Sequence, residues 1–336
     1  MKRYLLPVSV TIGLMILLFT QISLRDLYAL LKRADYQWIF LAVLGYLLAI
    51  SFRALRCRWL IHSKDVPLSD LFRISVFYHL SLMVLPSKLG ELSYPYFLNK
   101  LSGITITEGL ASLIASRIYD FFTLLVIFLI AFIEFQGLFH ANPVLMILLI
   151  VLLTGFTFLG FFYMSDLLKL LSKGLGKASY ALGLSRRQSL QWSLSKIDTI
   201  ADDFYAIKAR RTYLPVILAS MASWAFSYWM FYAFLRGFGI RTPLMKVVFG
   251  STIAIVANAL PISGLGNWGV LEAGWTAGFI LVGLSKVDAI TTGFGFHIFI
   301  FLTAVVAGFI CWVPFKARPF SAGLQIHGSR EAKREE

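Results

Sequence analysis

Six apolar stretches of helix length constrain the fold of this chain more than any other feature of its sequence. They cover approximately residues 4–20, 37–55, 108–134, 144–164, 213–235 and 289–312. About 20 apolar residues in a helix span the roughly 30 Å hydrocarbon core of a bilayer. The whole chain is 58% hydrophobic and 14% charged, which leaves too little polar surface for a soluble globule of 336 residues. We therefore expect an all-α polytopic membrane protein with about six full transmembrane helices.

Two shorter apolar regions, 71–85 and 244–260, each run into a polar interruption. The first break is LPSKLGELSYP, residues 85–95, and the second break is LPISGLGNWGVLE, residues 260–272. A second short piece, 92–103 or 270–284, follows each break, and at 1.5 Å per residue the leading regions would be only about 22–26 Å long. Each region is therefore predicted to be a broken helix pair, either a re-entrant hairpin or two short crossings, which allows up to ten membrane segments.

Proline and glycine would open the helices at the two breaks, because proline lacks an amide donor and glycine tolerates unusual backbone angles. The predicted turn residues are Pro86, Gly90, Pro261, Gly264 and Gly266. Backbone of this kind is tolerated at membrane depth only where it faces protein or a water-filled cavity.

The basic residues predict the orientation of the chain. They are dense in the segment 165–212 and absent from the link 135–143, so the positive-inside rule places the first in the cytoplasm and the second outside. Both termini then fall in the cytoplasm, although the basic loops 21–36 and 236–243 are exceptions. We expect one membrane domain, 1–315, in the cytoplasmic membrane of a prokaryote, and a basic cytoplasmic tail, 316–336.

The net charge of +14 is spread between the apolar runs, which favours contact with anionic lipid headgroups and argues against nucleic acid as a partner. In the segment 165–212, apolar residues recur at helical spacing beside basic ones. This pattern is typical of helices that lie on the inner leaflet, and a plain cytoplasmic linker is the alternative.

An internal repeat relates the two broken regions, with a first element at about 71–134 and a second at about 244–312. Gly103, Thr105, Glu108 and Arg117 match Gly283, Ser285, Asp288 and His297 at identical spacing. Thr105 and Ser285 are expected to cap helix starts, with the acid three residues later completing a capping box. Because the first element starts inside and the second outside, the repeat is predicted to be inverted, as in transporters with a site near the membrane midplane.

At these residues the sequence resembles the membrane domain of lysylphosphatidylglycerol synthase/flippase proteins and their stand-alone flippase-like relatives. The family pattern has Pro-Gly-Arg-x-Gly-Glu in a first block, Glu-Arg-x-x-Asp on the next helix, and a glycine-rich turn before Glu in a second block. The matching residues here are Pro86, Ser87, Lys88, Gly90 and Glu91, then Ser116, Arg117 and Asp120, then Pro261, Ser263, Gly264, Gly266 and Glu272.

Three positions depart from the family pattern. Lysine stands at Lys88 in place of arginine, which keeps the charge but loses a bidentate phosphate fork. Serine stands at Ser116 where an acid is common, and His297 stands where arginine is frequent. Only a short basic tail follows Trp312, so the resemblance implies lipid handling without the soluble lysyltransferase chemistry.

The candidate substrate-binding residues are Lys88, Glu91, Arg117, Asp120, Glu272 and His297. Ionisable groups at membrane depth are costly and should face protein or water. In the functional interpretation, Lys88 and Arg117 bind a lipid phosphate while the carboxylates hold them or receive a cationic headgroup. In the structural interpretation, Arg117 and Asp120 form a packing salt bridge, Glu91 and Glu272 cap free amides, and His297 is a packed core residue.

A lipid flippase that moves a phospholipid or polyprenyl-phosphate headgroup is the leading functional prediction, with anionic membrane lipids as partners. The alternatives are a secondary transporter of a small anion or a proton-coupled solute, an intramembrane serine hydrolase that uses Ser263 and His297, and a non-transporting scaffold. No phosphate-binding loop of the Gly-x-x-x-x-Gly-Lys-Ser/Thr type is present, and Cys57 and Cys311 are too isolated for a metal site. We therefore expect no cofactor, no metal and no enzymatic activity.

Overall fold

The computed structural model describes Lys32 and residues 34–85, 87–134, 143–181, 187–259 and 268–316, and every regular element in this part of the chain is helical. The helices are α3 (Tyr36–Leu60), α4 (Leu68–Val84), the short 3-10 helix η1 (Ser87–Leu92), α5 (Ser93–Ser102), α6 (Ile106–Glu134), α7 (Pro143–Ala181), α8 (Gln188–Ala209), α9 (Tyr213–Gly237), α10 (Leu244–Ala259), α11 (Val270–Leu281) and α12 (Lys286–Lys316).

Four of the described helices are long and apolar enough to cross a membrane: Tyr36–Leu60, Ile106–Ala131, Tyr213–Gly237 and Lys286–Val313. They coincide with four of the predicted windows, so the all-helical membrane class is confirmed. The window 144–164 forms the first part of α7. The window 4–20 and most of the tail lie outside the described residues, and the full count of crossings stays a prediction.

The first break is a helical interruption, as predicted. Helix α4 ends at Val84, η1 carries the chain through Ser87–Leu92, and α5 begins at once. A Cβ atom on Gly90 would lie 2.9 Å from the Cα of Leu82, so glycine is needed where η1 folds back onto α4. The rings of Tyr78 and Tyr94 meet farther from the turn, with centroids 5.4 Å apart. Helices α4 and α5 therefore form an antiparallel hairpin. Pro86 lies outside the described residues.

The second break also joins two antiparallel helices, α10 and α11. A Cβ atom on Gly278 would overlap the carbonyl oxygen of Gly250, and one on Gly274 would lie 2.6 Å from the Cβ of Ala257. Gly278, the later residue on α11, contacts Gly250, the earlier residue on α10, whereas Gly274 contacts Ala257. The two helices therefore run in opposite directions. Three predicted turn residues, Pro261, Gly264 and Gly266, lie outside the described residues.

Replacing Gly278 by alanine is expected to lower the free energy of unfolding by about 1–3 kcal/mol, because the added methyl group cannot fit against the α10 backbone. Thermal unfolding of the purified protein in detergent measures the effect. Gly155→Ala in α7 is the matched control, because a Cβ atom there meets nothing within 4 Å. Equal melting temperatures for the two variants would contradict the close α10–α11 contact.

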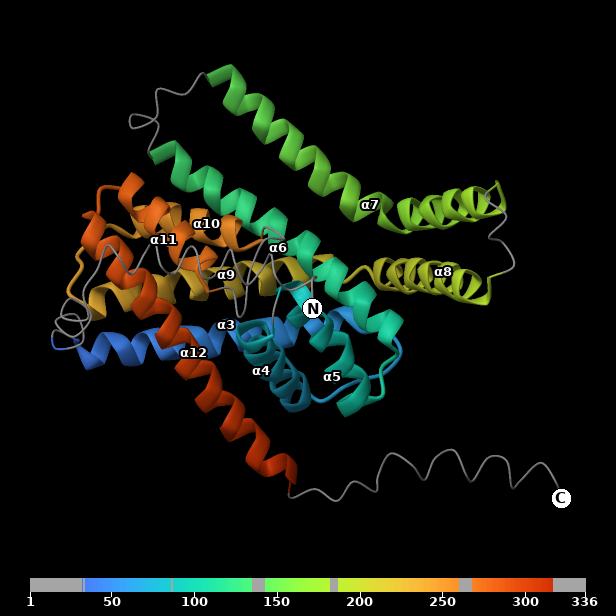
Figure 1. The fold of residues 1–336 in the computed structure, drawn as a ribbon, viewed down its shortest axis with the longest axis horizontal. Helices are drawn as coiled ribbons and strands as arrows, with labels where there is room; N and C mark the ends of the chain where they lie inside the picture. Colours follow the sequence, from blue (N-terminus) through green and yellow to red (C-terminus); the bar gives the residue numbers. More distant parts are fainter. Residues whose placement is uncertain are drawn as a thin grey trace.

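The centre of the bundle is the antiparallel pair α3 and α9, in which the Asp35 amide donates to the Gly237 carbonyl at 2.7 Å. A Cβ atom on Gly45 would lie 3.3 Å from the Cα of Met230, so the two backbones approach closely. Figure 1 shows α3 and α9 running alongside one another, with α6 and α12 crossing them obliquely. The site described below lies among α3, α4, α6 and α9.

The described part of the segment 165–212 forms a third hairpin, made by the C-terminal part of α7 and by α8. Helix α7 continues without interruption to Ala181, and α8 returns along it (Figure 1). The Lys169 ammonium lies 2.8 Å from the Asp202 carboxylate, and the Lys208 ammonium donates to the Phe162 carbonyl at 2.7 Å. The predicted location on the inner leaflet stays a prediction.

Both predicted helix caps are confirmed. The Thr105 hydroxyl accepts from the Glu108 amide at 3.2 Å, and the Ser285 hydroxyl accepts from the Asp288 amide at 3.1 Å. The capping box is wrong for Glu108, because its Oε1 atom accepts from the amides of His62 and Ser63 at 2.7 and 2.9 Å. This carboxylate therefore orders the loop after α3.

Candidate functional site

A cavity of about 130 Å³ opens among α3, α4, α5, α6 and α9. Its ionisable lining residues are Arg53, Arg56, Tyr78, His79, Tyr94, Arg117 and Asp120. Three arginines in apolar helices are unusual, since a charged side chain at membrane depth costs about 2.5–3.5 kcal/mol on insertion scales. We call this space the basic cavity.

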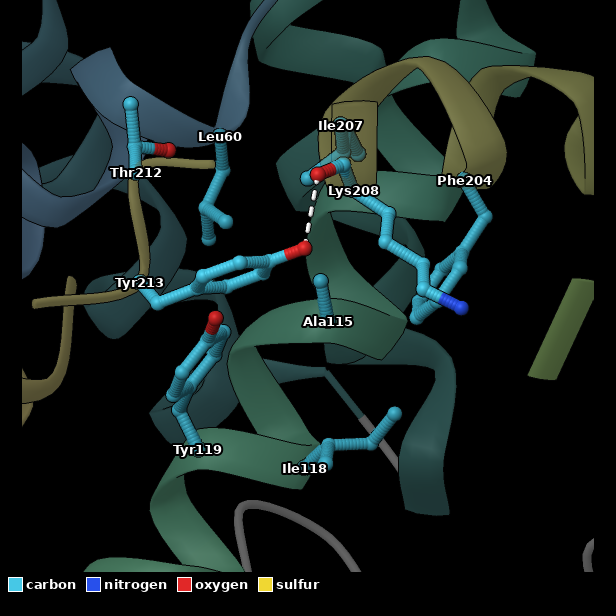
Figure 2. A pocket seen from close by; sticks show the side chains of 9 residues that line it. All are labelled: Leu60, Ala115, Ile118, Tyr119, Phe204, Ile207, Lys208, Thr212 and Tyr213. Atoms are coloured by element: carbon cyan, nitrogen blue, oxygen red, sulfur yellow. Dashed lines mark hydrogen bonds between the residues drawn. The ribbon is translucent and has the colours of Figure 1, made fainter. Parts of the chain in front are cut away.

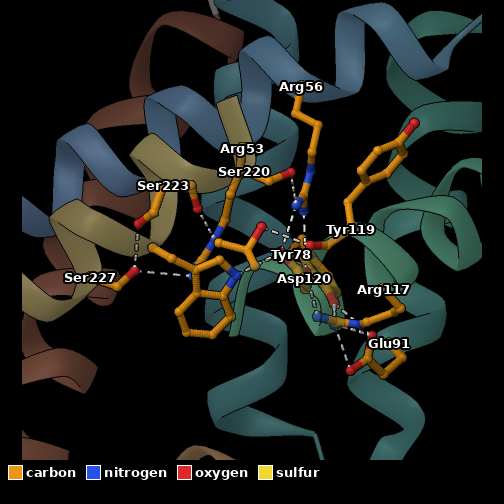
Figure 3. A network of polar contacts seen from close by, with 12 residues as sticks. Arg53, Arg56, Tyr78, Glu91, Arg117, Tyr119, Asp120, Ser220, Ser223 and Ser227 are labelled. Carbon is orange, nitrogen blue, oxygen red and sulfur yellow. Dashed lines mark hydrogen bonds and ion pairs between the residues drawn. The ribbon is translucent and has the colours of Figure 1, made fainter. Parts of the chain in front are cut away.

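Asp120 is the buried centre of the contacts around the basic cavity (Figure 3). Its Oδ1 atom accepts from Arg56 Nη1 at 2.6 Å and from Trp224 Nε1 at 2.9 Å. Its Oδ2 atom accepts from Arg56 Nη2 at 3.3 Å and from Arg117 Nη1 at 3.4 Å. A carboxylate offers about four acceptor positions, and all of those on Asp120 are engaged. The predicted Arg117–Asp120 pair is confirmed, and Asp120 also fixes a second arginine.

Arg117 and Glu91 form the more exposed part of the same network. Arg117 Nη2 lies 2.6 Å from Glu91 Oε2, and the exposed fractions of the two side chains are 42% and 26%. The Tyr78 hydroxyl donates to Glu91 Oε2 at 2.6 Å and also accepts from Arg117. The first break therefore contributes its carboxylate directly to the arginine on α6. Lys88 lies three residues earlier on η1, but its side chain lies outside the described residues.

Arg53 and Arg56 line the cavity but were not predicted as site residues, because Arg53 lies near the end of the predicted window 37–55 and Arg56 just beyond it. Helix α3 instead continues to Leu60, so both arginines lie on it within the bundle, and Arg56 is only 5% exposed. The available signal was their spacing of three in an otherwise apolar stretch, which brings both to one helix face. Arg56 is held further by the Ser220 hydroxyl, at 3.0 Å from Nη1.

The hydrogen-bond contacts of Arg53 are with two serine hydroxyls and a histidine ring. Its Nε donates to Ser223 Oγ at 3.2 Å, its Nη2 to Ser227 Oγ at 3.4 Å, and its Nη1 lies 2.6 Å from His79 Nε2. The guanidinium also lies over the Trp224 ring, 5.6 Å from its centroid. Within the described part of the chain, no carboxylate oxygen lies within 4 Å of Arg53.

Glu272 and His297 form a separate, fully buried pair. Glu272 Oε1 lies 2.7 Å from His297 Nδ1, and both side chains are 0% exposed. Glu272 Oε2 also accepts from the Gly269 amide at 2.8 Å, which is the capping role expected of it, and the Trp268 ring stacks on the imidazole at 3.9 Å. The structure thus groups the predicted site residues into two clusters, Glu91 with Arg117 and Asp120, and Glu272 with His297.

A second cavity, between α6, α8 and the junction of α3 with α9, is too small for a ligand (Figure 2). Its volume is about 20 Å³, which is room for a single water molecule. The Tyr213 hydroxyl beside it donates to the Lys208 carbonyl at 2.9 Å. This space is a small packing gap where the α7–α8 hairpin contacts the bundle.

A larger cleft of about 460 Å³ lies between α3, α4 and α12. Its lining is mostly apolar, with Leu68, Phe72 and Ile310, and its one arginine, Arg73, is paired with Asp70 at 3.0 Å. Ala54 faces this cleft while Arg53 faces the basic cavity, so α3 separates the two spaces.

Comparison with known proteins gives one family match. Residues 4–308 match the model of the lysylphosphatidylglycerol synthase TM region. No curated protein and no solved structure matches the chain.

Proposed function

The chain belongs to the family of the lysylphosphatidylglycerol synthase TM region, and on that premise we propose that it moves a lipid headgroup across the membrane through the basic cavity. The observation that carries this proposal is the cluster of Arg53, Arg56 and Arg117 around one space in a helical membrane protein. Guanidinium groups bind phosphate oxygens in a bidentate manner, and ionisable groups inside a membrane mark substrate pathways. The exposed Arg117 would meet the phosphate first.

Asp120 has a positioning role in this proposal, because its acceptor positions are already taken by protein donors. It holds Arg56 and Arg117 in the orientation that a phosphate needs. Glu91 forms an ion pair with Arg117 in this structure, and a bound phosphate would displace it from the guanidinium. The substrate-binding roles of Lys88, Glu272 and His297 stay predictions.

The acyl chains of the lipid would remain outside the basic cavity. The apolar cleft between α3, α4 and α12 lies on the other side of α3 from the arginines and is large enough, at about 460 Å³, to receive apolar chains. A lipid could thus keep its chains among apolar side chains while its phosphate is in the basic cavity. No covalent step and no cofactor is part of this mechanism.

The packing of the two halves supports an inverted repeat. Helix α3 packs on α9, α4 on α12, and α10 on α6, so α4 and α6 of the first element each contact a helix of the second. In both halves a carboxylate just after the break pairs with a base on the following long helix, Glu91 with Arg117 and Glu272 with His297. The shared pattern is the one that the matched sequence spacing predicts.

We propose further that both hairpins are re-entrant. Helices α5 and α11 have 10 and 12 residues, and at 1.5 Å per residue they are about 15 and 18 Å long. Each is too short for a hydrocarbon core of about 30 Å. We place the protein in the cytoplasmic membrane with the α7–α8 hairpin in the cytoplasm, on the basis of the basic residues in 165–212.

Transport of a small soluble anion is the second candidate, because a cavity of about 130 Å³ also suits a free phosphate ion. Reconstitution into liposomes separates the two functions. We expect the protein to expose fluorescent phospholipid headgroups from the inner leaflet to a membrane-impermeant quencher, without admitting labelled phosphate to the lumen. Phosphate entry without headgroup exposure would favour the second candidate.

A further inference from the structure

A histidine at the end of α3 joins the α7–α8 hairpin to the rest of the molecule. His62 follows α3 directly after its cap residue, and its Nε2 atom lies 3.3 Å from Asp203 Oδ1 on α8 and 3.8 Å from Glu108 Oε1 on α6. The ion pair between Lys169 and Asp202 lies within the hairpin. The contact between His62 and Asp203 is different, because it connects the hairpin to the bundle.

Glu108 fixes the backbone of His62 at this position. The Glu108 side chain is 1% exposed, and its Oε1 atom accepts from the amides of His62 and Ser63 at 2.7 and 2.9 Å. Both hydrogen bonds come from backbone N–H groups, so they do not require a charge on the imidazole. The loop after α3 therefore stays attached to α6, and the imidazole ring is the part of His62 whose contacts can change.

Asp203 depends on this imidazole for a charged partner. No lysine or arginine nitrogen of the described residues lies within 4 Å of the Asp203 or the Glu108 carboxylate. The Oδ2 atom of Asp203 is buried and has no hydrogen-bond partner among the described residues. A protonated imidazole places a positive charge between the two carboxylates. A neutral imidazole has a single N–H group, on one of its two nitrogens, and brings no charge to either.

The elements that meet at His62 carry other titratable side chains. Those with described contacts are Arg58, Lys64, Asp65, Lys208, Arg210 and Tyr213. Of the ordinary side chains, only histidine changes its charge between pH 5 and 8. The other described histidines, His79 and His297, lie on α4 and α12 within the bundle. A change with pH at the base of the hairpin therefore points to His62.

We propose that His62 is a pH-dependent latch that holds the α7–α8 hairpin against the bundle. At low pH the protonated imidazole bridges Glu108 on α6 and Asp203 on α8. As the pH rises from 5 to 8 the positive charge is lost, and the neutral ring can donate at most one hydrogen bond from Nε2. The apolar contacts of Phe204 and Ile207 with α6 remain (Figure 2). The hairpin therefore loosens at its base without unfolding.

The test measures the distance between the hairpin and the bundle by pulsed electron spin resonance on the full-length protein in lipid nanodiscs. Spin labels are attached at Thr199→Cys on α8 and Leu218→Cys on α9, both exposed positions, after Cys57 and Cys311 are replaced by alanine. At pH 5.5 we expect one narrow distance distribution. At pH 8.5 the fraction of molecules at other distances should rise by about fivefold or more, because a partly buried charge pair contributes more than an exposed one.

Three variants assign the effect to the latch. His62→Gln cannot take up a proton, so its distance distribution should be the same at both pH values. His62→Lys keeps a positive charge at both and should give the narrow distribution throughout. Asp203→Asn removes the partner on α8 and should also abolish the pH response, which keeps the proposal testable if the variants at position 62 fail to fold.

Asp202→Asn is the matched control, because this neighbouring carboxylate is 67% exposed and pairs within the hairpin. It should retain the pH response of the wild type. A wild-type distribution that is the same at pH 5.5 and 8.5 would overturn the latch, and so would a full pH response in His62→Gln or in Asp203→Asn.

The latch and the proposed lipid transfer can fail separately, because headgroup exposure in liposomes is a different measurement. A protein with a normal pH response but without headgroup transfer would retain the latch and lose the proposed function. A protein that transfers headgroups with its hairpin held equally at both pH values would lose the latch and retain the function.

Discussion

Asp120→Ala is expected to lower the free energy of unfolding by about 3–5 kcal/mol, because removing one partner of a buried ion pair leaves the other charge uncompensated. Arg56 is 5% exposed and would lose both of its contacts with this carboxylate. The Trp224 indole and Arg117 would lose an acceptor at the same time. Thermal unfolding in detergent, followed by circular dichroism, measures the change.

Two further variants test the cause of that effect. Asp202→Ala removes a carboxylate of an exposed pair, 2.8 Å from Lys169 and itself 67% exposed, and should change stability by about 0–1 kcal/mol. The double variant Arg56→Met with Asp120→Leu removes both charges and should recover much of the loss, since apolar residues of similar volume often replace a buried pair without cost. A melting temperature for Asp120→Ala equal to that of the wild type would contradict the buried network.

The fold was largely predictable because lipid restricts it. Apolar length fixed the positions of α3, α6, α9 and α12, and proline with glycine marked the ends of α4 and α10. The helix ends were less predictable. The hydropathy of 144–164 does not indicate that α7 continues to Ala181. The extension of α7 packs against α8, for example through Lys169 and Asp202, and these two residues are more than thirty positions apart in sequence.

The site was predictable only in part. Arg117 and Asp120 are three residues apart on one helix, so their pairing follows from helical geometry. The contact between Arg56 and Asp120 joins α3 to α6 across 64 residues, and no local sequence pattern predicts it. Arg53 lies near the end of the predicted window 37–55 and Arg56 just beyond it. The positive-inside rule counts charges near helix ends and cannot distinguish a loop arginine from one that turns into the bundle.

The geometry also corrects how the predicted site residues are grouped. The proposed repeat places Glu91 and Glu272 at equivalent positions, yet their environments differ. Glu91 is 26% exposed beside an arginine, whereas Glu272 is fully buried beside a histidine. Among the described residues, Glu91 therefore lies beside the arginines of the basic cavity, whereas Glu272 contacts a histidine.

Arg117→Ala is expected to reduce headgroup transfer in liposomes by about 100-fold, because loss of a charged partner in a phosphate contact costs about 2–5 kcal/mol. The Arg117 side chain is 42% exposed, against 6% for Arg56, and it lies between Glu91 and Asp120. Arg117→Lys keeps the charge but loses the planar fork, so a smaller loss is expected. The initial rate of headgroup quenching is the measurement.

Arg58→Ala is the matched control for Arg117→Ala. Arg58 is also an arginine in an ion pair, 3.3 Å from Asp65, and its side chain is 46% exposed, close to the 42% of Arg117. Arg58 lies outside the lining of the basic cavity, and the loss of an exposed ion pair has little effect on stability. The transfer rate of Arg58→Ala should therefore stay within about twofold of the wild-type rate. Similar rates for Arg117→Ala and Arg58→Ala, with both proteins folded, would show that the phosphate passes elsewhere. If the transfer rate falls in Arg117→Ala and not in Arg58→Ala, the transfer route passes Arg117, which links Glu91 of the first break to the buried Asp120.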